Sequence, residues 1–93
     1  MITIAMIRAA TIAETGILAV EMDSPRRNAG SVRARWVAQW LCRQLTAASY
    51  PQIARAFGRD HSSIHHAVQR VQTSDELRAL ALRVSARIPE GAQ

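Results

Sequence analysis

The side chains best suited to chemistry gather in one short stretch between positions 59 and 70. It holds every histidine of the chain, one aspartate and two adjacent serines: Asp60, His61, Ser62, Ser63, His65 and His66. Aspartate can accept a hydrogen bond from a cytosine amino group, histidine can bond a base edge, and a hydroxyl can donate or accept. This composition favours a helix end that contacts DNA bases and phosphates.

A metal-binding or catalytic use of the same residues is the alternative interpretation. His61 and His65 are four residues apart, so on a helix they would share a face, as metal ligands can. However, no glutamate follows the first histidine as it does in zinc proteases, and Cys42 is expected on a different, buried face. The serines lie outside any Gly-x-Ser-x-Gly motif. A small metal-dependent enzyme is therefore a minor alternative, and we expect no metal, no cofactor and no catalytic residue.

The elements that must position these residues are two short helices joined by a tight turn. Ser49 is a good N-cap for the first helix, and Pro51 fits its first turn, where a missing N–H costs nothing. Gly58 should end that helix, because glycine readily adopts positive φ, and Asp60 can cap the second helix. Apolar residues mark one face of each helix: Ile53, Ala54 and Phe57, then Ile64, Ala67, Val68 and Val71. This layout predicts a helix-turn-helix.

Arginine supplies every basic charge, because the chain has no lysine. Between Ser24 and Gln72 there are eight arginines and one acidic residue, which gives a net charge of +7 over about half of the chain. A surplus of this size around a helix-turn-helix indicates a polyanionic partner, and a merely solubilising surface is the weaker alternative. Without lysine there is no Walker A loop, so we expect no nucleotide partner. The single cysteine fits a reducing cytoplasm, and no apolar run is long enough to span a membrane.

The remaining sequence predicts further helices and one basic loop, which together make an all-α domain of about six short helices over residues 1–93. Helices are expected over residues 3–15, 18–23, 32–46 and 73–88, and a basic loop over residues 24–31. The last helix is expected to begin at a capping box of Thr73 and Glu76 and to end before Pro89. It would either close the core or dock a partner.

The long helix over residues 32–46 should carry the core stripe. We expect that stripe to consist of Trp36, Val37, Trp40, Leu41 and Leu45. Gln39 is expected to point elsewhere. Trp36 has two interpretations: it caps the core, or it lays its indole N–H on a phosphate.

The stretch Ala-Phe-Gly-Arg-Asp-His-Ser-Ser-Ile-His-His-Ala resembles a known signature. The C-terminal DNA-binding domain (domain IV) of the bacterial replication initiator DnaA reads Phe-Gly-Gly-Arg-Asp-His-Thr-Thr-Val-Leu-His-Ala. Ile2-Thr3-Ile4, Gly16-Ile17 and Arg26-Arg27 extend the resemblance to about residues 2–72. This chain lacks one glycine before Arg59 and has serines in place of both threonines. The resemblance implies a DnaA domain IV-like fold, which is similar to that of the Trp repressor.

The resemblance also implies roles for single residues. Base contacts are implied for Arg27 in the minor groove and, in the major groove, for Asp60, His61 and Ser62. Contacts to the DNA backbone are implied or expected for nine others: Arg26, Arg35, Trp36, Tyr50, Pro51, Arg59, Ser63, His66 and Arg70.

These residues lead to the hypothesis of a sequence-specific protein that binds double-stranded DNA and regulates transcription. The narrowest form is an activator of phage-like or gene-transfer-agent genes, whose DnaA-like modules the chain resembles. Double-stranded DNA is the expected partner, with RNA polymerase, a sigma-like protein or another DNA-bending or regulatory protein beside it, and no membrane. The expected location is the cytoplasm, at the nucleoid. The alternatives are a replication-control protein that competes at DnaA boxes and a protein-interaction module.

Overall fold

The computed structural model describes residues 1–24 and 28–89, which contain six α-helices and no strand. In chain order the helices are α1 (Ile4–Thr15), α2 (Ala19–Asp23), α3 (Ala29–Leu45), α4 (Tyr50–Phe57), α5 (His61–Gln72) and α6 (Asp75–Ser85). The all-α prediction is therefore confirmed. Two of the predicted DNA contacts, Arg26 and Arg27, lie outside the described residues.

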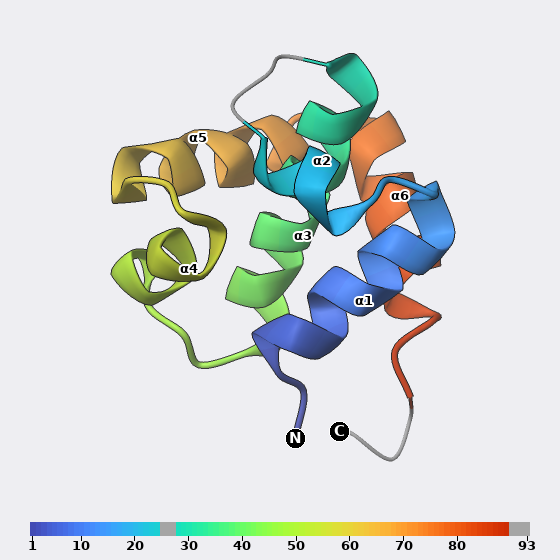
Figure 1. Cartoon of the computed structure of the whole chain (residues 1–93), viewed down its shortest axis with the longest axis horizontal. Helices are drawn as coiled ribbons and strands as arrows, with labels where there is room; N and C mark the ends of the chain where they lie inside the picture. The colour runs from blue at the N-terminus through green and yellow to red at the C-terminus, as the bar shows by residue number, and fades with distance from the viewer. Residues whose placement is uncertain (25–27, 90–93) are drawn as a thin grey trace.

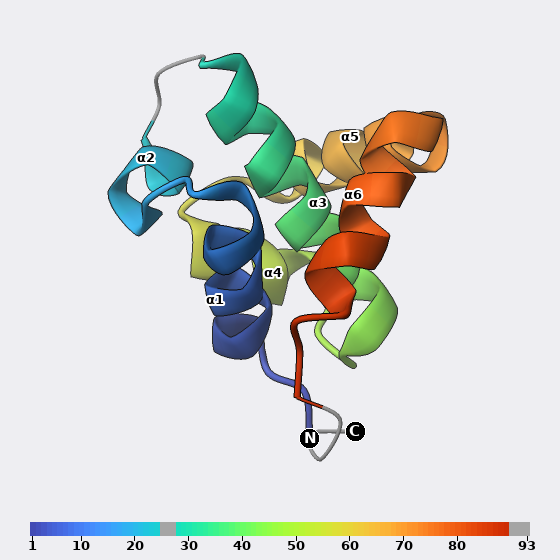
Figure 2. The ribbon, with the colours of Figure 1, turned by 90° about the vertical axis from the view of Figure 1, so that its right-hand side faces the viewer.

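The long helix α3 is the centre around which the others pack (Figure 1). It contacts each of the other five helices, and its most extensive contact is with α5. Figure 2 shows α6 running beside α3, while α1 packs against both of them. The α4–α5 pair lies against α3. Helix α5 begins at its end away from α6, so its first turn lies far from α6 (Figure 1).

The core is built from all six helices. Its members that are fully inaccessible include Ile7 of α1, Met22 of α2, Val37 of α3, Ile53 of α4 and Ile64 of α5. Burial of large aliphatic side chains contributes about 1.5–3 kcal/mol each, so α3 and α5 are fixed chiefly by this cluster. The apolar face predicted for the helix-turn-helix is confirmed, because every residue assigned to it is buried.

Two predicted boundaries are confirmed by the capping groups. The Thr3 hydroxyl accepts from the N–H of Met6 at 3.2 Å and begins α1, which ends at Gly16 with φ of 74°. Positive φ is strained for residues with a Cβ, so Gly16 is required there for conformational reasons.

The predicted loop over residues 24–31 is wrong at its end, because α3 begins at Ala29. Asparagine is common in turns, so Asn28 is one of the residues that favour a loop in this stretch. Its side-chain oxygen instead accepts from the N–H groups of Gly30, at 2.9 Å, and Ser31, at 3.3 Å. Asparagine serves turns and helix N-caps equally well, so the sequence leaves the choice open.

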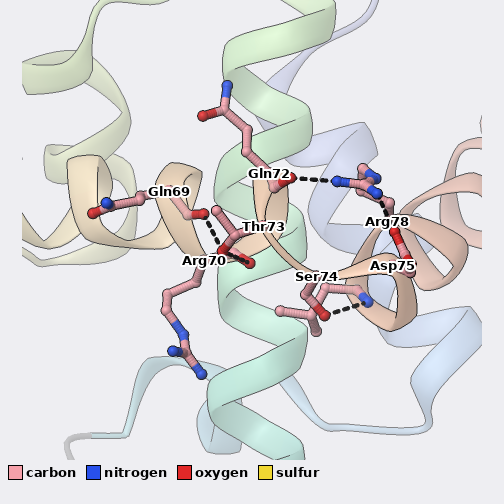
Figure 3. Close-up of polar contacts among 8 residues, drawn as sticks. Gln69, Arg70, Gln72, Thr73, Ser74, Asp75 and Arg78 are labelled. Atoms are coloured by element: carbon pink, nitrogen blue, oxygen red, sulfur yellow. Dashed lines mark hydrogen bonds and ion pairs between the residues drawn. The ribbon is translucent and has the colours of Figure 1, made fainter.

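The predicted capping box at the last helix is also wrong. Ser74 begins α6, and its hydroxyl accepts from the N–H of Leu77 at 3.2 Å. Thr73 instead caps the end of α5, and its hydroxyl donates to the Gln69 carbonyl at 2.9 Å (Figure 3). Helix α6 ends at Ser85, three residues earlier than expected, although Ile88 beyond its end is still buried.

The core stripe of α3 differs from the prediction in two residues. Gln39 is 1% exposed, although it was expected to face away from the core. Leu45 was expected inside and is 37% exposed. The reason is that α3 is enclosed by helices on several sides along its middle, so a single narrow stripe underestimates its buried surface.

Candidate nucleic-acid interface

The first helix of the helix-turn-helix, α4, is capped as its sequence predicts. The Ser49 hydroxyl accepts from the N–H of Gln52 at 3.2 Å, and the Gln52 side chain accepts from the N–H of Ser49 at 2.7 Å. Pro51 occupies the first turn. Gly58 ends the helix with φ of 64°, which turns the chain toward α5.

Asp60 organises the first turn of α5. Its Oδ1 atom accepts three hydrogen bonds: from the Ser62 hydroxyl at 2.7 Å, the Ser63 N–H at 2.9 Å and the Ser63 hydroxyl at 3.1 Å. These bonds, the one from Ser62 foremost, lower the pKa of the Asp60 carboxyl below its ordinary value of 3.8. Asp60 is therefore a carboxylate at neutral pH, able only to accept hydrogen bonds.

The residues predicted to contact bases form an exposed tip. Asp60, His61 and Ser62 are all exposed, and they occupy consecutive positions at the N-terminal end of α5. Ser63, the next residue, is half-buried and turns toward α3. The tip thus presents an acceptor, an imidazole and a hydroxyl together at one end of a helix.

Beside the tip lies an open groove of about 400 Å³ between α3 and α5. Six of its lining residues belong to the predicted DNA contacts: Arg35, Trp36, Arg59, Ser62, Ser63 and His66. The groove therefore brings together residues that are up to 31 positions apart in sequence. Val32 and Gln39 complete its wall, and neither was predicted from the sequence.

Two arginines of the groove reach the start of the basic loop. Arg59 donates from Nη2 to the Ser24 carbonyl at 2.9 Å, across 35 positions of sequence. Arg35 donates from Nη1 to the Met22 carbonyl at 3.0 Å and to the Ser24 carbonyl at 3.4 Å. Arg59, in the turn of the helix-turn-helix, and Arg35, on α3, therefore both donate to the carbonyl of the first residue of the loop.

Trp36 lies on the rim of the groove between two residues of α5. The His66 ring meets the indole edge-on, with ring centroids 5.5 Å apart. The Arg70 guanidinium lies over the indole, with its carbon 5.2 Å from the ring centroid. Trp36 is half-buried, so both sequence-based interpretations of it, as a lid on the core and as a surface contact, are compatible with its position.

Tyr50 and Pro51 lie apart from this groove, at the first turn of α4. The Tyr50 ring stacks on the His65 ring, with centroids 3.9 Å apart and an angle of 26° between the planes. The Arg43 guanidinium lies over the same tyrosine ring at 4.8 Å. Neither His65 nor Arg43 was among the predicted contacts, because their approach to Tyr50 depends on how α3, α4 and α5 pack.

The described part of the chain contains no cluster of side chains that would support the metal-site alternative. No group of three or more histidine, cysteine, aspartate or glutamate side chains is close enough there to hold a metal ion. The His61 and His65 rings are 6.2 Å apart, edge to face. Within residues 1–24 and 28–89, no helix is long and apolar enough to cross a membrane.

Comparison with known proteins places this geometry in a family. Residues 4–71 match the family described as the bacterial DnaA protein helix-turn-helix. The chromosomal replication initiator DnaA of Caulobacter sp. (strain K31) is 46% identical over 72 residues, which cover 76% of this chain and 15% of that protein. The DnaA of Dechloromonas aromatica is 46% identical over 63 residues, 67% of this chain and 13% of that protein.

The match covers most of this chain but only a small part of each relative. The DnaA of Sphingopyxis alaskensis is 44% identical over 72 residues, which again cover 76% of this chain but 16% of the relative. The chain thus spans a small part of the length of these curated relatives. Because the family match includes all of α1 to α4 and nearly all of α5, the chain belongs to the bacterial DnaA helix-turn-helix family.

Proposed function

We propose that the chain binds double-stranded DNA in a sequence-specific manner, with the first turn of α5 in the major groove. The observation that carries this proposal is the exposed tip of Asp60, His61 and Ser62 on a helix whose opposite face is fixed in the core. In helix-turn-helix proteins the second helix enters the major groove and its N-terminal residues contact base edges. Asp60 then accepts from a cytosine amino group, while His61 and Ser62 bond neighbouring base edges.

The groove between α3 and α5 supplies the contacts to the DNA backbone. Ser63, His66 and Arg59 line it on the α4–α5 side, and Arg35 and Trp36 line it on the α3 side. Phosphate contacts fix register and orientation without reading sequence. Arg70, above the Trp36 indole, adds a cation at the rim.

The first turn of α4 supplies a second set of backbone contacts. Tyr50 and Pro51 stand at the start of that helix, outside the residues that line the groove, and the Tyr50 ring stacks on that of His65. A duplex whose major groove holds α5 has phosphates on both sides of the helix, so one strand faces the groove and the other faces α4.

The basic loop contacts the minor groove in this proposal. Arg27 enters the minor groove, where narrow A/T-rich segments focus negative potential, and Arg26 contacts a phosphate. The hydrogen bonds from Arg35 and Arg59 to the Ser24 carbonyl support this role, because they fix the start of the loop beside the helix-turn-helix.

In its finer form the proposal is a transcription regulator located at the nucleoid in the cytoplasm. The 93 residues contain no lysine and hence no Walker A loop, so the proposed activity needs no nucleotide. The resemblance to DnaA-like modules of phage-borne and gene-transfer-agent regulators supports promoters as targets. RNA polymerase, a sigma-like protein or a DNA-bending protein would then act with it.

The DNA-binding claim is tested by titrating a labelled duplex library with the purified chain at two salt concentrations. We expect a steep loss of affinity with salt, and Arg70→Ala should flatten the logarithmic salt slope by about one unit for all sequences alike. Arg83→Ala, on α6, is the matched control and should leave the slope unchanged. Failure of the wild-type chain to bind any duplex at low salt would refute the proposal.

The regulator claim is tested separately by mapping the chromosomal DNA that co-precipitates with the chain. We expect enrichment upstream of a small set of genes, including phage-like or gene-transfer-agent genes, and altered transcripts from them when the chain is removed. Enrichment confined to DnaA boxes at the replication origin would instead favour replication control.

A further inference from the structure

The exposed face of α5 carries a second imidazole one turn beyond the tip. His65 is exposed and follows His61 by four residues, so both lie on the same side of the helix. Their ring centroids are 6.2 Å apart. Four residues advance a helix by about 6 Å, which is less than the rise of two base pairs at about 3.4 Å each. With α5 lying along the major groove, a base pair next to, or next but one to, that of His61 is within its reach.

The orientation of the His65 ring is fixed, and its two nitrogens remain available for hydrogen bonds. It stacks on the half-buried Tyr50 ring at 3.9 Å, and Arg43 covers that tyrosine at 4.8 Å. The stack occupies the face of the imidazole and leaves its edge, with both nitrogens, for hydrogen bonding. None of the hydrogen bonds in the described part of the chain involves those nitrogens. A base-contacting side chain that is already held in place before binding loses less conformational entropy when it binds.

His66, the neighbouring histidine, has a different environment. Its ring meets Trp36 edge-on in the groove between α3 and α5, where the proposal places one of the two sets of phosphate contacts. His65 instead stacks on Tyr50 of α4, and its ring centroid lies 6.2 Å from that of His61 at the tip. The two adjacent histidines therefore face different parts of a bound duplex.

We propose that His65, held by its stack on Tyr50, is a further base-contacting residue that determines sequence specificity at one base pair beyond those read by the tip. This inference rests on the proposed DNA binding and adds a residue to it. The imidazole edge donates to, or accepts from, a base edge in the major groove. The DnaA signature has leucine at this position, so the chain should prefer a different base there from a protein with leucine.

The test uses the whole chain and a duplex obtained by selection from a random library with the wild-type protein. Affinity is then measured for a series of duplexes in which each base pair is replaced in turn. Wild-type protein should discriminate at one position by about 5- to 150-fold, and His65→Ala should lose that discrimination while keeping it at all other positions. Gln72→Ala, at the opposite end of α5, is the matched control.

Two further variants test the role of the stack. Tyr50→Phe keeps the ring and should keep the discrimination at that base pair, whereas Tyr50→Leu should weaken it although His65 is present. His65→Leu should change the preferred base at that position alone, since leucine can contact only the thymine methyl group. Circular dichroism of each variant shows that the fold is intact.

The outcomes separate the two proposals. If the wild-type chain selects no sequence, the proposed DNA reading fails and the role of His65 fails with it. If the wild-type chain selects a sequence but His65→Ala either weakens all duplexes equally or changes nothing, only the base contact of His65 is overturned. A uniform loss would assign His65 to a phosphate.

Discussion

Gln39 provides the sharpest test of the packing. It is 1% exposed at the centre of α3, and its side-chain Nε2 has no hydrogen-bond partner in the described part of the chain. A buried amide that lacks its partner costs about 1–3 kcal/mol. Methionine has a similar volume and helix propensity and carries no polar hydrogen, so misfit should cost under about 1.5 kcal/mol. The middle of the first range exceeds the misfit cost, so Gln39→Met should raise the free energy of unfolding by about 1 kcal/mol.

Urea unfolding followed by circular dichroism measures this change directly. The midpoint should rise with an unchanged m-value, and the thermal midpoint should rise by roughly 4–8 °C for each kcal/mol. Gln44→Met is the matched control, because Gln44 is exposed on the same helix and its replacement should stay within about 0.5 kcal/mol of wild type. A Gln39→Met variant less stable than wild type would refute the reasoning and show that the amide has a stabilising partner.

Three other predictions follow from single contacts. Ser49→Ala removes the cap of α4 and should lower the free energy of unfolding by about 1 kcal/mol in urea titrations, unless another group caps the helix. The hydrogen bonds from Ser62 and Ser63 lower the pKa of Asp60 in the folded state. Asp60 therefore stabilises the fold at pH values above its unfolded-state pKa, and this stabilisation is lost as the pH falls through its folded-state pKa. The free energy of unfolding, measured from about pH 5 down to pH 2, should fall less for Asp60→Asn than for the wild-type chain. An equal fall in both proteins would contradict this. Burial raises the pKa of the Cys42 thiol to about 12, so alkylation at pH 8 should be slow until urea unfolds the chain; fast labelling of the native chain would exclude that burial.

The helix-turn-helix could be predicted from the sequence because its signals are local. Ser49, Gly58 and Asp60 each act within three or four residues of their own position, and the structure places all three as expected. Local signals fail where one residue type has two uses. Asn28 supports a turn as well as a helix cap, and only its bonds to two successive N–H groups reveal that it begins α3.

The shape of the candidate site could not be predicted in the same way. The burial of Gln39 depends on the helices that surround α3, and no pattern within α3 reports them. Arg35 and Arg59 both donate hydrogen bonds to the Ser24 carbonyl, and these bonds join segments that are far apart in the chain. The stack of His65 on Tyr50 likewise follows from the angle between α4 and α5.

The account depends on the first turn of α5 lying against the bases of a duplex, and a tethered cleavage reagent tests that position most directly. Cys42 is buried, so Gln69→Cys provides one accessible thiol for an iron–EDTA group at an exposed position of α5 that is not among the proposed DNA contacts. Leu82→Cys, at a position 72% exposed, is the control tether, because its helix α6 lies away from the first turn of α5 (Figure 1). We predict cleavage confined to a few base pairs within the selected site for the Gln69 tether and none there for the Leu82 tether. Equal, diffuse cleavage from both positions, or strong cleavage from Leu82 alone, would contradict the account.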